Sequence, residues 1–322
     1  MALPDEALFR RTWRVRVQFT QTEALDVSAL DLEFKILRTL KPAPNRAVIT
    51  LWNVNPEHRA ALLKRNRPNG PNGADVPIFV QVEAGYQGRN ATLLSADMRE
   101  VASRREGESW KTLISMDDGG AAVRAARFPN GGVQFTKGTP IGQVLRQAAS
   151  AVGIGLGNAG NYEATADIFG WNKVLPHTMT LTGPAYDGLK RVTDSIGVTL
   201  SVQGGVLQLL PKGRPLRQSA IRLSPDTGLL ESPEAAIDST VSLGFAKTAS
   251  GRPSTPSPPH PRNTGILKVK SLLIPGLVPG RVVQLDSEAY KGSYEISEVE
   301  YVGQSFGTEW CAIMVLRSYV NA

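Results

Sequence analysis

The chain has 322 residues and a mass of 34.7 kDa, with a formal net charge of +7, a sequence pI near 9.6 and one cysteine. This length can bury two or three hydrophobic cores, and one cysteine excludes an internal disulfide framework. No stretch approaches the ~18 consecutive apolar residues of a membrane-spanning helix, and the N-terminus lacks the apolar segment of a secretory signal peptide. We therefore expect synthesis in a cytoplasm and no membrane insertion.

Two antiparallel strands are expected first. Residues 12–20 and 31–40 each place apolar side chains on one face with a period of two. The polar face of the first strand carries Arg14 and Arg16. A basic strand suits phosphate or an acidic partner, and it is also an ordinary solvated face, which is the interpretation we favour.

A turn, a strand and a short helix follow. Prolines and Asn45 make the turn, and residues 47–52 form the strand. Asn55 is the expected N-cap of the helix and Pro56 its first residue. The buried side of this helix is predicted to carry Ala60, Leu62 and Leu63.

Residues 76–117 are echoed by residues 278–318. Each copy opens with Val-Pro, reaches a turn that contains Tyr86 or Tyr290, and closes on a strand that begins with Trp110 or Trp310. We predict that the copies superpose, with Tyr86 matching Tyr290 and Trp110 falling near Trp310, as structural or interface residues rather than ligand-binding ones. The alternative is that any two β-meanders look alike in a single sequence.

Both copies also change strand parity in the same place. The series Leu94, Ala96 and Met98 gives way to Val101, and the series Tyr294 and Ile296 gives way to Val299. An odd step in a strand indicates a bulge, which bends the strand as a small barrel requires. The sequence therefore predicts two related bulged β units.

The middle of the chain, residues 119–212, differs in character and holds a second repeat. Residues 139–156 match residues 183–200 without a gap, 44 positions later. Each copy has a proline at a helix start, an apolar stripe at helical spacing, a C-cap glycine and a following strand, and the second copy continues into a hairpin. This pattern predicts a compact α+β module.

The predicted fold is mainly β with an α+β insert. Residues 1–118 form a first tube-like antiparallel β-barrel domain, residues 119–212 the α+β module, and residues 213–322 a second such barrel. Within the last domain, residues 247–264 are rich in proline and serine and nearly free of apolar residues. We expect an extended, mobile loop there.

Chemical motifs are weak. Gly155-x-Gly157-x-x-Gly160 matches a dinucleotide-binding pattern but follows a predicted helix, where such a site needs a strand. His58, His177 and His260 are far apart and lack metal-ligand spacing. We predict no catalytic residue, no cofactor and no metal.

Acidic side chains are the remaining candidates for chemistry. Asp117, Asp118, Glu295, Glu298 and Glu300 could be paired as acids and bases, but strands and turns ordinarily carry solvated carboxylates. The whole pattern favours a scaffold over an enzyme.

Several short motifs at both ends of the chain carry a resemblance to a known family. The N-terminal motifs are Pro44-Asn45-x-Ala47-x-Ile49-x-Leu51-x-Asn53, Val80-x-Val82-x-Ala84-Gly85-Tyr86 and Asp117-Asp118-Gly119. The C-terminal motifs are Thr227-Gly228-Leu229-Leu230-x-Ser232-Pro233, residues 273–280 and Gly292-x-Tyr294-x-Ile296-x-x-Val299. Together they resemble bacteriophage tail baseplate hub proteins of the late control D type, over nearly the whole chain. The proline-rich loop departs from the pattern.

The resemblance implies a homotrimer in the baseplate of a virion tail, without enzymatic activity. Two tube-like barrels per chain would form a ring of six similar units, which adapts the sixfold tail tube above to the threefold central spike below. Its partners would be itself, the tube protein, the spike protein and other baseplate proteins. DNA would pass through the lumen without sequence-specific binding, and Arg14 and Arg16 would line the channel or bind acidic partners.

Two other classes stay open. A carbohydrate-binding β protein of the tail would use the tryptophan, tyrosine and loop content, although the helix repeat argues against it. A wall-degrading enzyme carried by a tail would use an acid such as Asp117.

Overall fold

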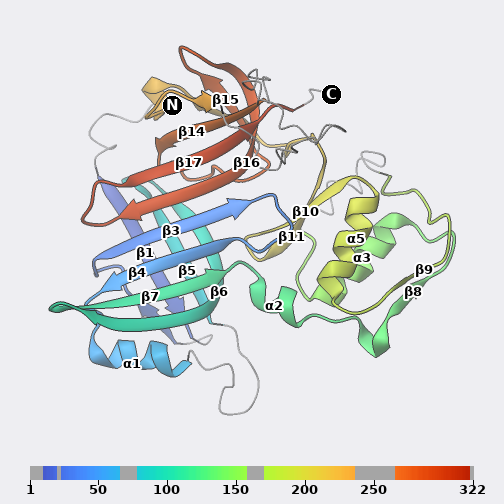
Figure 1. Ribbon diagram of the computed structural model, residues 1–322, viewed down its shortest axis with the longest axis horizontal. Helices are drawn as coiled ribbons and strands as arrows, with labels where there is room; N and C mark the ends of the chain where they lie inside the picture. The colour runs from blue at the N-terminus through green and yellow to red at the C-terminus, as the bar shows by residue number, and fades with distance from the viewer. Residues whose placement is uncertain (1–9, 20–22, 66–77, 158–169, 236–264, 320–322) are drawn as a thin grey trace, which may run out of the picture.

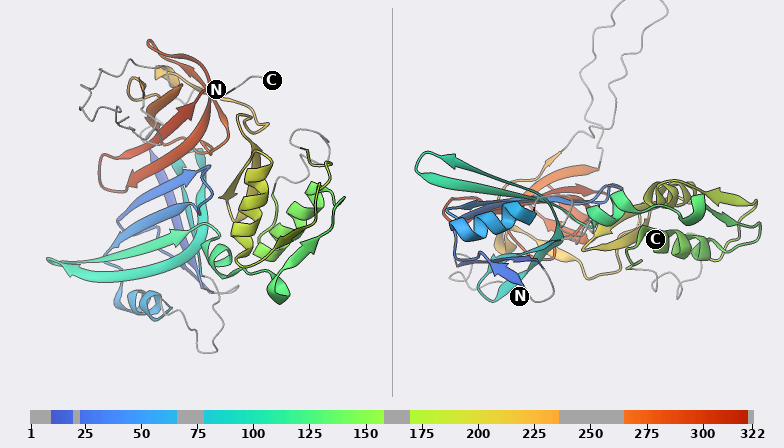
Figure 2. Two further views of the ribbon diagram at one scale, coloured as in Figure 1. Left: turned by 45° about the vertical axis from the view of Figure 1, so that its right-hand side comes forward. Right: turned by 90° about the horizontal axis from the view of Figure 1, so that it is seen from below.

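A large β-sheet and a small helical module make up the molecule, in a computed structural model that describes residues 10–19, 23–65, 78–157, 170–235 and 265–319. The module lies to one side of the sheet and covers neither of its faces (Figures 1 and 2). The predicted class, mainly β with a small α-containing insert, is confirmed. The proline-rich segment 247–264 lies outside the described residues, as does His260.

The sheet has thirteen strands drawn from both ends of the chain. Its path runs β13-β14-β17-β16-β3-β4-β7-β6-β5-β1-β2, and β12 joins through β15, which pairs with β16. The N-terminal strands are β1 (Arg11–Gln18), β2 (Ala24–Asp26), β3 (Leu32–Thr39), β4 (Arg46–Trp52), β5 (Phe79–Tyr86), β6 (Arg89–Glu106) and β7 (Ser109–Asp117). The C-terminal strands are β12 (Ile221–Leu223), β13 (Glu234–Ala235), β14 (Ile266–Leu272), β15 (Val282–Asp286), β16 (Lys291–Gln304) and β17 (Trp310–Arg317).

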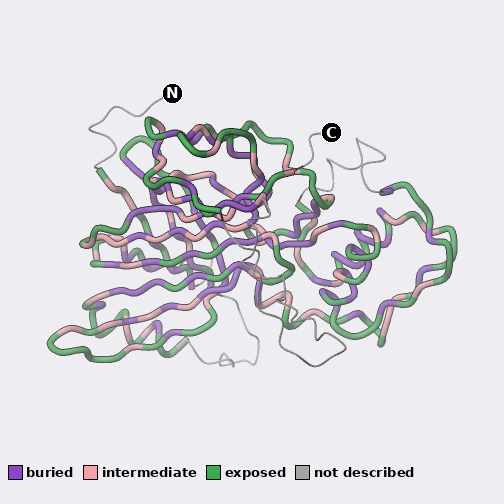
Figure 3. Tube along the Cα trace, turned by 45° about the horizontal axis from the view of Figure 1, so that its top comes forward, coloured by how far each residue is buried: buried purple, intermediate pink, exposed green. Residues whose placement is uncertain are grey.

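The two β halves meet at one pair of strands, β3 and β16. Residues 33–39 of β3 pair antiparallel with residues 298–304 of β16, and Ile36 lies opposite Tyr301. One hydrophobic cluster contains buried side chains of both halves. The strands predicted for two β domains therefore form one sheet with one core. Buried and exposed residues alternate along these strands, as the period of two requires (Figure 3).

Each half contains the same four-stranded unit. The order β4-β7-β6-β5 of the first half matches β14-β17-β16-β15 of the second. The register shifts between Met98 and Glu100 in β6 and between Ile296 and Glu298 in β16, each time against the closing strand. The two predicted bulges are confirmed at the parity steps.

The strands beyond each unit differ. In the first half β1 runs antiparallel to β5, whereas in the second half β12 runs parallel to β15. The two halves are therefore similar in their four central strands and dissimilar at the outer edge of β5 and β15.

Helix α1 (Pro56–Arg65) begins where the sequence predicts. The side-chain Oδ1 of Asn55 accepts a hydrogen bond of 2.7 Å from the backbone N–H of His58, which is the contact of an N-cap. The predicted buried side is wrong in part, because only Leu62 is buried, whereas Ala60 and Leu63 are exposed. This helix packs against β6 through the buried Leu62, and its Arg59 lies over the ring of Trp110 on β7.

The module has its own core. It contains α2 (Gly120–Ala125), α3 (Ile141–Val152), α5 (Ala185–Ser195), the 3-10 turn η2 (Pro129–Gly131), the strand pair β8 (Val133–Phe135) and β9 (Met179–Leu181), and the hairpin β10 (Val198–Gln203) and β11 (Val206–Pro211). The 3-10 turn η3 (Pro225–Thr227) follows β12. The repeated helices α3 and α5 pack against each other. Gly153 caps α3 with φ 81°, a left-handed conformation that favours glycine.

The predicted strand after α3 is reduced to an isolated bridge between Leu156 and Leu207. Gly155 and Gly157 exchange backbone hydrogen bonds with Leu207, and a helix precedes them, as the sequence indicated. Gly160 lies outside the described residues.

A buried polar cluster fastens the module to the sheet. Asp118 is fully buried, and its carboxylate accepts hydrogen bonds from the backbone N–H groups of Gly204 and Gly205, at 2.8 and 2.6 Å. Asn45 donates to Asp118 at 3.0 Å and to the carbonyl of Val202 at 2.7 Å. Because these buried groups satisfy each other, removing one partner by mutation would leave the others buried and unpaired, at a cost of about 1–3 kcal/mol per group.

Candidate interaction surfaces on the two hairpins

The first hairpin is β6–β7 from Met98 to Met116, and the second hairpin is β16–β17 from Ile296 to Leu316. Met98 lies opposite Met116, just before the first bulge, and Ile296 lies opposite Leu316, just before the second. Counting from the bulges, Trp110 opposite Arg105 takes the place of Trp310 opposite Gly303. The register thus makes the two tryptophans equivalent in the backbone.

Their surroundings differ. The side chain of Trp310 is buried with 4% of its surface exposed, its ring centroid 5.5 Å from that of Phe34 and 6.0 Å from that of Trp13, both edge to face. Its indole N–H donates to the backbone oxygen of Gly85 at 3.2 Å. Arg11 lies over the same ring at 5.5 Å. Strands of the first half therefore enclose this tryptophan.

Trp110 is 36% exposed. The guanidinium of Arg59, on α1, lies 3.7 Å from its ring centroid, a cation–π contact. Its backbone N–H donates to Oδ1 of Asn53 at 3.0 Å. The first hairpin projects from the sheet, and its tip is exposed (Figures 1 and 3).

The outer edges of the two hairpins differ in the same way. In the second hairpin, residues 298–304 of β16 pair with β3. The equivalent residues of the first hairpin, 100–106, pair with β7 on one side, and no strand among the described residues pairs with their other side. The first hairpin therefore carries an open backbone edge.

The two tyrosines lie at the turn ends of their units. Tyr86 is the last residue of β5 and is buried, which raises the pKa of its phenol. Tyr290 directly precedes β16, is partly buried and accepts a backbone bond of 3.0 Å from Ser287. Both pack on the main core. Their predicted roles as structural or interface residues stay a prediction.

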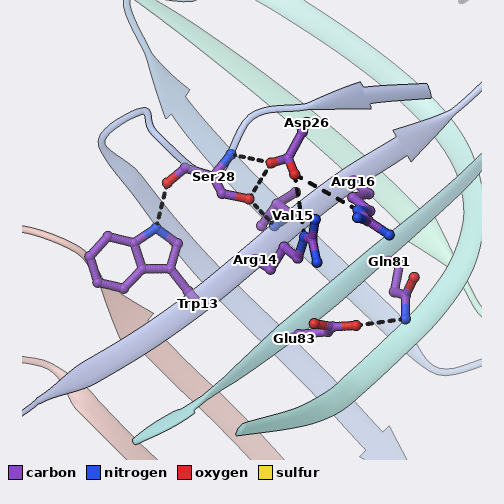
Figure 4. Close-up of polar contacts among 8 residues, drawn as sticks. All are labelled: Trp13, Arg14, Val15, Arg16, Asp26, Ser28, Gln81 and Glu83. Atoms are coloured by element: carbon purple, nitrogen blue, oxygen red, sulfur yellow. Dashed lines mark hydrogen bonds and ion pairs between the residues drawn. The ribbon is translucent and has the colours of Figure 1, made fainter. Parts of the chain in front are cut away.

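Arg14 and Arg16 lie on the exposed face of β1 and share one acidic partner (Figure 4). Their Nε atoms lie 3.3 and 3.8 Å from the carboxylate of Asp26. Hydrogen bonding from Ser28, and then the contact with Arg14, lower the pKa of Asp26. Part of the local positive charge is therefore balanced within the chain. The predicted contact of these arginines with a channel or an acidic partner stays a prediction.

The candidate acids have basic partners on nearby segments. Asp117 is buried and contacts the guanidinium of Arg124 at 2.6 Å and that of Arg99 at 3.6 Å. Glu298 and Glu300 face Lys41 and Lys35 at 3.5 and 3.2 Å. No group of three potential metal ligands occurs in the part of the chain that the structure describes.

Glu295 is a different case. It is buried, and burial raises the pKa of its carboxyl to about 7. The equivalent residue of the first unit is Asp97, which is also buried and whose pKa is raised for the same reason. The backbone N–H of Ala121 donates to Asp97 at 3.1 Å and lowers its pKa in part.

A cleft of about 590 Å³ lies beside Trp310, at the seam of the two halves. Arg11, Trp13, Lys270 and Cys311 are among its lining residues. Burial raises the pKa of the Cys311 thiol to about 11, so the thiol is protonated at neutral pH and is not activated as a nucleophile. Sequence reasoning missed this cleft, because its walls come from both ends of the chain.

None of the helices in the described part of the chain combines the length and the apolar character that a membrane span needs.

No protein-family model and no curated protein sequence matches this chain. Solved structures do. The 43 kDa tail protein of prophage MuSo2 from Shewanella oneidensis aligns with a TM-score of 0.59 at 11% identity, over 95% of this chain and 97% of that one. The tail protein from Neisseria meningitidis MC58 gives 0.58 at 10% identity, over 95% and 97%.

The third similar structure is the c3393 protein of E. coli, a component of the type VI secretion system with structural similarity to the bacteriophage T4 tail proteins gp27 and gp5. It aligns with a TM-score of 0.53 at 9% identity, over 95% of this chain and 77% of that one. At such identities the likeness establishes a shared fold over nearly the whole chain.

Proposed function

We propose that this chain is a structural baseplate hub of a phage tail. Three copies form a homotrimeric ring of six similar β units, which joins the tail tube to the central spike and surrounds the DNA channel. The observation that carries the proposal is the duplicated four-stranded unit, held edge to edge in one sheet at β3 and β16.

Duplication gives a physical reason for the ring. A chain that presents two similar units side by side can occupy two positions of a sixfold arrangement, so three chains present six similar surfaces. One face of such a ring matches a sixfold partner, while the differences between the two units keep threefold symmetry for the other partner. The fold shared with prophage tail proteins supports this assignment.

The contacts of the acidic residues support a scaffold. Asp117, the acid on which a wall-degrading activity would rest, is buried opposite Asp97, and its carboxylate contacts the guanidinium groups of Arg124 and Arg99. Its arrangement is that of an ion-pair network that ties β7 to α2. We therefore assign to Asp117 a structural role, which is to hold α2 of the module against β7 of the sheet.

The oligomeric state tests the proposal. Light scattering on the purified chain should give a particle of three times the 34.7 kDa mass of one chain, and addition of the tail tube and spike proteins should give a larger particle that contains three copies of it. Negative-stain images should show a ring with a central channel. Monomers under all these conditions would contradict the proposal.

A further inference from the structure

Several backbone edges of the sheet have no strand neighbour among the described residues, and the second hairpin shows what can cover the edge of a hairpin. On the second hairpin, β3 occupies it, with Ile36 opposite Tyr301 and Lys35 opposite Val302. The backbone N–H of Ser305 donates to Leu32, and that of Leu40 donates to Ser297, so the ladder is continuous. The equivalent edge of the first hairpin, residues 100–106, has no strand of its own chain among the described residues. Open edges are the sites at which strands of other chains add.

The outer edge of β13 also has no strand neighbour among the described residues, and β13 occupies in the second half the place of β3 in the first. β3 pairs with β4, with Ile36 opposite Ala47, and Ala47 lies opposite Met116. β13 pairs with β14, with Ala235 opposite Leu267, and Leu267 lies opposite Leu316. Since Met116 and Leu316 are equivalent, Ala235 is the counterpart of Ile36.

β13 cannot reach the first hairpin of its own chain. Six strands separate β13 from β6 in the sheet order. At about 4.8 Å between neighbouring strands they lie roughly 34 Å apart, measured across the sheet. If β13 completes the open edge of β6 in the same geometry, it therefore comes from a second copy.

We propose that β13 of one copy adds to the open edge of β6 in the next copy, antiparallel, with Ala235 opposite Ser103 and Glu234 opposite Arg104. This pairing rests on the proposed ring and names its contact between copies. It repeats between chains the β3–β16 pairing that each chain makes internally, so all six units meet by one kind of edge contact.

Two independent observations favour a second copy as the occupant. The charges match, because the register places the exposed carboxylate of Glu234 beside the exposed guanidinium of Arg104, and opposite charges across a strand pair are favourable. Trp110 is 36% exposed where its equivalent Trp310 is 4% exposed, and the rings that cover Trp310 come from β3 and β1 of the adjoining first half. The first hairpin lacks that adjoining unit within its own chain.

A disulfide tests the register. In the β3–β16 ladder, Lys35 and Val302 alternate with the hydrogen-bonded positions, and residues in such non-bonded pairs have Cα atoms about 4.5 Å apart, close enough for a disulfide. The variant Arg104→Cys with Glu234→Cys should therefore form covalent dimers and trimers on oxidation, reversible by reductant. The matched control is Ala102→Cys with Glu234→Cys, whose positions are two residues out of register. It should not cross-link, because diagonal neighbours lie about 7–8 Å apart.

A charge swap tests the same pair without covalent chemistry. Arg104→Glu or Glu234→Arg alone should raise the concentration at which half the chains form trimers about tenfold, and the double swap should restore it. The control variant Arg191→Glu changes an exposed arginine of α5 in the module. It changes the net charge by the same amount as Arg104→Glu and should leave trimer formation unchanged.

The outcomes separate the two proposals. A trimer that neither cross-links at 104 and 234 nor responds to the charge swap keeps the proposed ring and overturns this edge contact. A chain that stays monomeric with its tube and spike partners overturns both.

Discussion

The two hairpins have the same backbone and opposite surroundings. Each has a bulge at the same position and a tryptophan at the same place on its closing strand. The second hairpin is enclosed by β3 and β1, whereas the first projects from the sheet with an open edge. Local sequence therefore determines the strands and the bulge of each hairpin. Contacts with the neighbouring half of the sheet determine which of its residues are buried.

The largest expected effect separates the two tryptophans. Trp310→Ala should lower the free energy of unfolding by about 4 kcal/mol, because it empties a buried site between Phe34 and Trp13. Trp110→Ala in the same urea titration should cost about 1 kcal/mol, the loss of the Arg59 contact and of partial burial. Equal losses from the two variants would contradict the comparison.

The residues opposite the tryptophans give the next effect. Gly303→Ala would place a methyl group against the Phe34 ring and should cost about 2 kcal/mol, measured by thermal or urea unfolding. Arg105→Ala, at the equivalent place on the open edge, should change stability by less than about 0.5 kcal/mol. An unchanged free energy of unfolding in Gly303→Ala would contradict the close contact between Gly303 and the Phe34 ring of β3.

The buried acids before the bulges predict a dependence on pH. The folded-state pKa of Glu295 is raised to about 7 from an ordinary 4.5. The folded state therefore holds this proton more tightly than the unfolded state. Its contribution to the free energy of unfolding is complete below pH 4.5 and is lost as the pH rises through 7. Glu295→Gln should therefore match the wild type at low pH and exceed it by about 3 kcal/mol above pH 7.

Unfolding curves at a series of pH values measure this advantage. Asp97→Asn should show the same sign with a smaller advantage, because the Ala121 N–H already favours the charged form of Asp97. An advantage of Glu295→Gln that is independent of pH would contradict the assignment.

The smallest effect on folding is expected on β1. Arg14→Glu with Arg16→Glu should change stability by less than about 1 kcal/mol, since both contacts with Asp26 are exposed. Trimer assembly should be unaffected. Virions that carry the variant should eject DNA poorly if this face lines the channel, which an infectivity assay on normally assembled particles measures. Normal ejection with impaired assembly would instead assign the arginines to a protein contact.

Much of the local fold could be predicted from the sequence. Alternation located the strands, and the parity steps after Met98 and Ile296 located both bulges, because a strand cannot keep one apolar face across an odd step without an extra residue. Asn55 and Pro56 fixed the start of α1, and the 44-residue repeat located α3 and α5. Apart from the comparison of the two repeat copies, these signals lie within a few residues of the structure that they determine.

Tertiary structure alone decided the rest. The union of both halves at β3 and β16, the exposure of Trp110 against the burial of Trp310, and the packing of α1 against β6 through Leu62 depend on contacts between distant segments. So do the partner of Arg14 and Arg16 and the raised pKa of Glu295. The sequence by itself determined two similar units, since strand period and bulge are local properties. Only the packing of one unit against the other decided which hairpin is covered, because burial depends on what lies beside a residue in space.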